Sequence, residues 1–185
     1  MNDALWAFGR VSGIVSLLLL TVSVVLGIVT RSGRPLPGLP RFSVSLVHRN
    51  IAILASVFLL LHVGTLLLDT YAKLTLTDII VPFVGSYRPF WQGLGTVAFD
   101  LLLAVVITSL LRRRIGVRTF KAVHWLTYAM WPVALIHSIG NGTNGTSGWF
   151  LLVAIVCALA VVVTLSWRLS ARFLETAAAR ERALK

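Results

Sequence analysis

The chain has little of what soluble proteins use most. Only 12% of its 185 residues are charged, and only six are Asp or Glu. Soluble domains carry about a quarter charged residues and about 45–50% apolar ones, whereas here 57% are hydrophobic and the mean hydropathy is +0.89. The shortage of charge excludes an ordinary soluble domain. The apolar excess excludes a disordered chain, because disorder requires too few apolar residues to bury.

Cysteine is also nearly absent, since Cys157 is the single one and lies in an apolar run. One cysteine excludes an internal disulfide and any cluster of thiolate metal ligands. The net charge of +11 is compatible with nucleic-acid binding. No basic stretch belongs to a soluble domain, however, so the sequence predicts no nucleic-acid partner. Basic residues that flank apolar runs are instead typical of membrane proteins.

Five apolar runs are each long enough to cross a hydrocarbon layer of about 30 Å as a helix. They cover residues 5–30, 45–70, 94–111, 120–139 and 149–167. The sequence therefore predicts an all-α membrane protein, a bundle of five transmembrane helices in a lipid bilayer.

The distribution of Lys and Arg predicts the orientation of this bundle. Of the 17 such residues, 14 lie in segments 31–49, 112–121 and 168–185, and three lie elsewhere: Arg10, Lys73 and Arg88. Because Lys and Arg accumulate in cytoplasmic segments, we expect a multi-pass protein of the plasma membrane. Its N-terminus would lie outside and its C-terminus in the cytoplasm.

All four histidines lie in two of the five runs, where ionisable groups are costly and mark functional sites. His48 and His62 are 14 residues apart, which is about 21 Å along a helix and about 40° short of four full turns. They therefore leave one face at two levels, too far apart for one zinc ion. His124 and His137 are 13 residues apart, about 140° from a common face. We expect a distortion at Pro132 to re-aim His137.

The topology predicts how these histidines pair. The two histidine-bearing runs are separated by one span and so run in the same direction, which sets His48 against His124 on the cytoplasmic side. His62 then faces His137 on the outer side. Each pair can offer two axial imidazoles to a flat macrocycle, and two stacked bis-histidine haems suited to electron transfer are the predicted occupants.

This histidine spacing, in two helices separated by one other, resembles the ferric reductase-like transmembrane domain family. The segments 86–91, 94–98 and 110–116 and the sequence from His124 to Tyr128 are similar to small actinobacterial members. The resemblance implies two b-type haems, bound by residues 1–172 and followed by a short basic cytoplasmic tail, 173–185. It implies electron transfer from a cytoplasmic or quinol donor to an extracytoplasmic acceptor.

Two departures from the family qualify the resemblance. The usual core has six helices against the five expected here. Most members also carry a flavin- and NADPH-binding domain after the last helix, where this chain shows no G-x-G-x-x-G motif. We therefore expect a separate flavoprotein or a quinol as redox partner, and the sequence leaves the oligomeric state open.

Further candidate residues follow from the chemistry of haem. Its propionates are anionic, so candidate partners are Arg88 on the outer side and Arg49, Arg118 and Lys121 on the inner side; the alternative is interfacial or positive-inside charge. Trp131, near mid-membrane, is a candidate for a position between the haems or for ordinary packing. The alternative function is a haem-free transporter or assembly subunit that uses its histidines for proton or metal passage.

Overall fold

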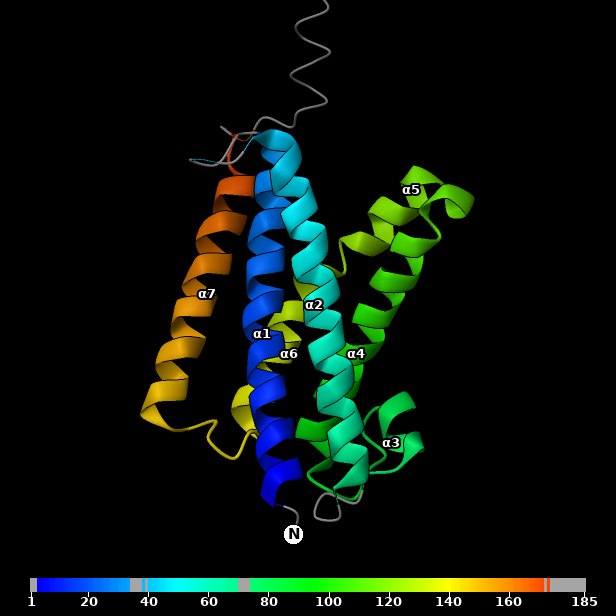
Figure 1. The fold of residues 1–185 in the computed structure, drawn as a ribbon, viewed down its shortest axis with the longest axis vertical. Coiled ribbons are helices and arrows are strands. Elements are labelled where there is room, and N and C mark those ends of the chain that lie inside the picture. The colour runs from blue at the N-terminus through cyan, green and yellow to red at the C-terminus, as the bar shows by residue number, and fades with distance from the viewer. Residues whose placement is uncertain (1–2, 34–37, 39, 70–73, 172, 174–185) are drawn as a thin grey trace, which may run out of the picture.

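The computed structural model describes residues 3–33, 38, 40–69, 74–171 and 173, and every regular element among them is a helix (Figure 1). The helices are α1 (Asp3–Ser32), α2 (Arg41–Leu68), α3 (Leu76–Ile80), α4 (Pro89–Leu110), α5 (Arg112–His124), α6 (Thr127–Asn141) and α7 (Gly148–Leu169). Arg34, Lys73, Arg172 and segment 174–185, which contributed to the expected orientation and tail, lie outside the described residues.

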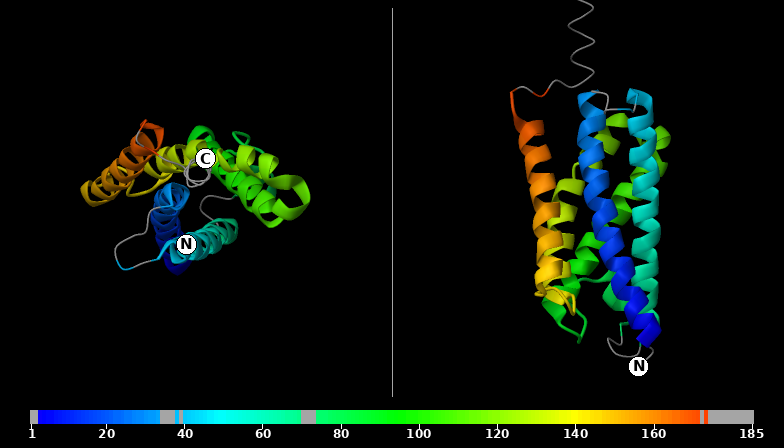
Figure 2. Two further views of the ribbon diagram at one scale, coloured as in Figure 1. Left: turned by 90° about the horizontal axis from the view of Figure 1, so that it is seen from above. Right: turned by 60° about the vertical axis from the view of Figure 1, so that its left-hand side comes forward.

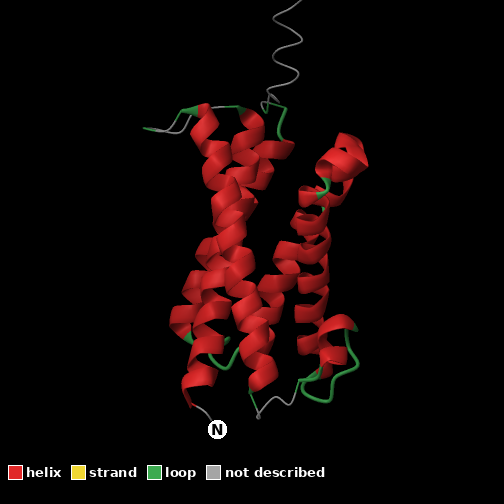
Figure 3. Ribbon diagram, turned by 45° about the vertical axis from the view of Figure 1, so that its right-hand side comes forward, coloured by secondary structure: helices red, strands yellow, loops and turns green. Residues whose placement is uncertain are grey.

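The long helices α1, α2, α4, α6 and α7 run alternately up and down one bundle (Figures 1 and 2). The N-terminal end of α1 and the C-terminal end of α7 therefore lie at opposite ends of it. Helices α1 and α2 form one hairpin, and α4 and α6 pack together as a second, with α6 also in contact with α1 and α7. The short helices α3 and α5 lie beside the two ends of α4 (Figure 3).

Four of these helices are long and apolar enough to cross a membrane: Ala4–Ser32, Phe42–Leu68, Pro89–Leu110 and Gly148–Leu169. Their outward faces carry large apolar side chains such as Leu60, Leu152 and Val163, which are 59%, 64% and 63% exposed. Water would disfavour so much exposed apolar surface, whereas lipid tails match it. The chain is a multi-pass helical membrane protein, and its apolar belt faces the bilayer.

The segment 120–139 is not the single helix that its apolar run predicts. Helix α5 ends at His124 and α6 begins at Thr127, and between them the Leu126 N–H donates to the Val123 carbonyl at 2.9 Å. Such bonds to the third residue back form a 3₁₀ turn, which rotates the chain relative to an α-helix. Helix α6 continues through Pro132, where a distortion was expected.

Glycine and proline set several of the other boundaries. Gly33 follows α1 with a φ of 65°, the left-handed conformation that commonly ends a helix. Pro89 opens α4, where its missing N–H costs nothing. Gly116, with a φ of 84°, divides α5 into two short pieces.

The core lies at mid-height, where α1, α4, α6 and α7 meet. Met130 and Trp131 of α6 are only 2% and 4% exposed, and they pack with Leu20, Leu102 and Val161. The Trp131 indole N–H donates to the Thr21 hydroxyl at 2.9 Å, so this buried polar group is satisfied. This packed layer separates the two levels at which the histidines lie along α2.

Candidate functional site

We call His48 and His124 the inner pair and His62 and His137 the outer pair, after the sides of the membrane expected for them. The inner pair joins the end of α5 to α2. The ring centroids of His48 and His124 are 6.4 Å apart, and the ring planes are inclined by 82°. Two imidazoles bound to opposite faces of one metal, about 2 Å from each nitrogen, have centroids roughly 6–6.5 Å apart. The spacing of the two rings therefore fits axial coordination of a single iron between them.

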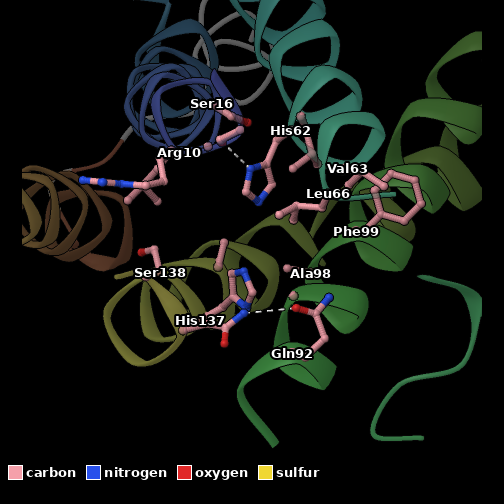
Figure 4. A pocket seen from close by; sticks show the side chains of 18 of the residues that line it. Arg10, Ser16, His62, Val63, Leu66, Gln92, Ala98, Phe99, His137 and Ser138 are labelled. Atoms are coloured by element: carbon pink, nitrogen blue, oxygen red, sulfur yellow. Dashed lines mark hydrogen bonds between the residues drawn. The ribbon is translucent and has the colours of Figure 1, made fainter. Parts of the chain in front are cut away.

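The outer pair faces a cavity of about 210 Å³ between α1, α2, α4 and α6. His62 and His137 point into it from opposite sides (Figure 4). Apolar side chains such as Leu66 and Phe99 form much of the walls shown, and polar ones such as Gln92 and Ser138 lie on different sides. A mostly apolar cavity with one imidazole on either side and a few polar groups suits a flat, mostly apolar macrocycle.

Three of the four imidazoles are oriented by a backbone carbonyl. The Nδ1–H of His62 donates to Gly9 at 2.7 Å, that of His48 to Ser23 at 2.9 Å, and that of His137 to Trp91 at 2.7 Å. Because a carbonyl only accepts, Nδ1 carries the proton in each ring, and the lone pair is left on Nε2. Histidines that ligate metals are held in this way, with the second nitrogen bonded to a carbonyl or carboxylate.

His124 differs from the other three. Its Nδ1 is buried and has no hydrogen-bond partner among the described residues. Its ring packs instead against Phe120, with centroids 5.1 Å apart. The inner pair is therefore asymmetric, with one imidazole fixed by a carbonyl and the other by aromatic packing.

Both histidines of α2 bond to α1, so they share one face of their helix, as their 14-residue spacing predicts. Between His124 and His137 lie both the 3₁₀ turn at Trp125 and Leu126 and Pro132, where the re-aiming was expected. Among the described residues, no three of His, Cys, Asp and Glu gather to hold a metal ion. A haem iron needs only two protein ligands, which is what each pair offers.

The predicted propionate partners lie away from the outer cavity or on the surface. Arg88 is exposed at the start of α4, with a φ of 42°, and is not among the residues that line the cavity. Arg49, Arg118 and Lys121 are also exposed. Trp131 lies in the core between the two levels.

The sequence reasoning missed Arg10. It is the one Lys or Arg among the described residues that line the outer cavity, and its guanidinium lies over the Trp6 ring, 4.2 Å from the centroid. The signal in the sequence is a charged residue inside the first apolar run, where charge is costly in a membrane.

The fold is that of a multi-pass helical membrane protein, and its four histidines lie in two pairs at different levels of the bundle. A family model described as the ferric reductase like transmembrane component matches residues 12–135, more than half of the chain. The chain belongs to this family, and membership suggests transmembrane electron transfer. The match includes three of the four histidines and ends just before His137. Searches of curated proteins and of solved structures found no match.

Proposed function

We propose that the chain carries electrons across the membrane with two b-type haems, each held by one histidine pair. The observation that carries this proposal is the 6.4 Å separation of the His48 and His124 rings. A bound haem supplies an iron that changes its charge by one electron at a time. Each haem iron would be held by two imidazoles, which favours electron transfer over the binding of oxygen.

The residues around the two sites orient the imidazoles and fill the space between the sites. The carbonyls of Gly9, Ser23 and Trp91 fix three rings with Nε2 unprotonated. Met130 and Trp131 fill the layer between the levels of His48 and His62, and we assign Trp131 to a position between the two cofactors. Arg88, Arg49, Arg118 and Lys121 remain candidates for electrostatic support at the membrane surfaces.

The five-span topology is part of the proposal. Helix α6 has 15 residues, or about 22 Å, and the turn at Trp125 and Leu126 would extend it toward the full thickness of the bilayer. Five crossings place the two termini of the chain on opposite sides of the membrane. With the chain in the plasma membrane, the distribution of Lys and Arg then puts the N-terminus outside the cell and the C-terminus in the cytoplasm.

The redox partners follow from this orientation. A separate flavoprotein or a quinol would supply electrons on the cytoplasmic side, near His48 and His124. An extracytoplasmic acceptor would take them near His62 and His137. In this proposal residues 1–172 form the haem-binding domain, and 173–185 form a basic tail.

The proposal predicts that the protein, expressed with a haem supply and purified in mild detergent, binds two haems per chain. We expect a visible spectrum typical of six-coordinate b-type haem, with resolvable alpha bands on reduction, measured together with the ratio of haem to protein. A folded but colourless protein would overturn the proposal. It would favour the alternative of a haem-free transporter or assembly subunit.

A second prediction concerns Arg10, which we assign to the carboxylates of the outer haem. Arg10→Gln removes a positive charge beside the outer cavity, so the oxidised form is favoured and the midpoint potential of that haem falls by roughly tens of millivolts. Arg113→Gln is the matched control, because Arg113 is exposed on α5 and is not among the residues that line the cavity. Equal shifts in the two variants, measured by redox titration, would remove the assignment.

A further inference from the structure

Three glycines lie directly against the carbonyl-bonded imidazoles. The carbonyls that accept from His62, His48 and His137 belong to residues 9, 23 and 91. Four residues further along the same helices are Gly13, Gly27 and Gly95. The same arrangement therefore occurs three times, twice in α1 and once in α4.

Helix geometry explains the four-residue interval. The Cα–Cβ bond tilts toward the helix N-terminus, so the side chain at one position covers the preceding turn, including the carbonyl four residues earlier. Any side chain other than that of glycine would cover this carbonyl. Because a carbonyl oxygen has two lone pairs, it can accept from an imidazole as well as from its own helix.

The space at each glycine shows how closely the ring approaches. A Cβ at Gly95 would lie 2.5 Å from Cε1 of His137, and one at Gly13 would lie 2.9 Å from Cε1 of His62. At Gly27 the nearest atom would be Cε1 of His48, at 3.3 Å. The clash therefore decreases from Gly95 through Gly13 to Gly27, and each glycine meets a different histidine.

We propose that Gly13, Gly27 and Gly95 are positioning residues that control the electronic character of the axial ligands. Each gives one imidazole access to a helix carbonyl and thereby holds Nδ1 protonated and Nε2 basic. This inference rests on the proposed function, because it assigns the role of these glycines toward iron-bound histidines. We call each such pair of glycine and carbonyl a seat. Among the described residues no seat meets His124, so the inner site has one seat and the outer site has two.

The test replaces each glycine by alanine and measures the midpoint potentials and low-temperature EPR signals of both haems. Displacing an imidazole from its carbonyl makes the ligand less basic and weakens its hold on the ferric iron. If this loss is about tenfold relative to the ferrous iron, the potential rises by about 59 mV. We expect Gly95→Ala to raise the potential of the outer haem most, and Gly13→Ala to raise it less.

Gly27→Ala is expected to shift the inner haem alone, by the smallest amount. In each variant the other haem is an internal reference, since a general disturbance of the bundle would move both. Gly64→Ala is the matched control, because Gly64 lies within α2 and no atom lies within 4 Å of a Cβ there. It should leave both haems at the wild-type potentials.

The outcomes separate this inference from the proposed function. A wild-type protein without haem defeats the proposed function and the inference with it. A wild-type protein with two haems, but with glycine variants whose potentials and EPR signals match those of Gly64→Ala, overturns the inference alone. If Gly95→Ala does not fold, the milder Gly27→Ala variant provides the test. A change in the potential or EPR signal of the inner haem alone supports the inference, and no change in either overturns it.

Discussion

Replacing His62 by glycine is expected to remove one of the two haems and to leave the other bound. His62 is one of the two imidazoles at the outer cavity, so in the proposed site its removal would leave the haem iron with one protein ligand. His48 and His124 lie on the far side of the core layer of Met130 and Trp131, so the inner site should persist. The measurements are the haem-to-protein ratio, which should fall from about two to about one, and the reduced spectrum, which should lose one alpha band.

Two further measurements control for misfolding. Added imidazole should restore the outer haem in His62→Gly, because the ligand enters the space that the side chain leaves. His48→Gly should give the converse result, losing the inner haem and keeping the outer one. Loss of both haems in each variant, with no recovery on adding imidazole, would contradict two separate sites.

Replacing Trp131 by alanine is expected to cause the largest loss of folding stability of any single tryptophan substitution in the described part of the chain. Trp131 is 4% exposed, packs in the central layer and donates to Thr21. Truncation of a buried tryptophan leaves a cavity and typically costs about 3–5 kcal/mol. Thermal unfolding in detergent, followed by circular dichroism, should show the change.

Two variants separate packing from hydrogen bonding at this position. Thr21→Val keeps the shape but leaves the indole N–H without its acceptor, at an expected cost of about 1–3 kcal/mol. Trp149→Ala is the matched control, because Trp149 is 49% exposed on α7 and its loss should change stability little. A Trp131→Ala protein as stable as Trp149→Ala would show that the core layer does not depend on this ring.

The sequence predicted four spans to within a few residues because each is a long apolar run bounded by polar or turn residues. It did not predict the break between α5 and α6. No glycine or proline marks that break, and the residues around it, Val123 to Thr127, continue an apolar pattern. The Arg168 guanidinium of α7 lies over the rings of Trp125 and Tyr128 there, at 4.6 and 5.5 Å, and a tertiary contact of this kind cannot be read from one sequence.

The sequence predicted only part of the candidate site as well. The 14-residue spacing placed His48 and His62 on one face, because the angle between two side chains on a straight helix follows from the number of residues between them. The position of His137 could not be calculated, since it depends on the turn after His124. Arg10 and the glycine seats were missed because their roles depend on which helix lies opposite, and a single sequence does not state that.

The three seats are divided between the two hairpins of the bundle. His48 and His62 bond to α1, their neighbour in the first hairpin, and His137 bonds to α4, its neighbour in the second. Each hairpin therefore contains the carbonyls that orient its own imidazoles, so this orientation does not require the other hairpin. His124 is the exception, since its ring packs on Phe120 of its own helix and its Nδ1 bonds to no group among the described residues.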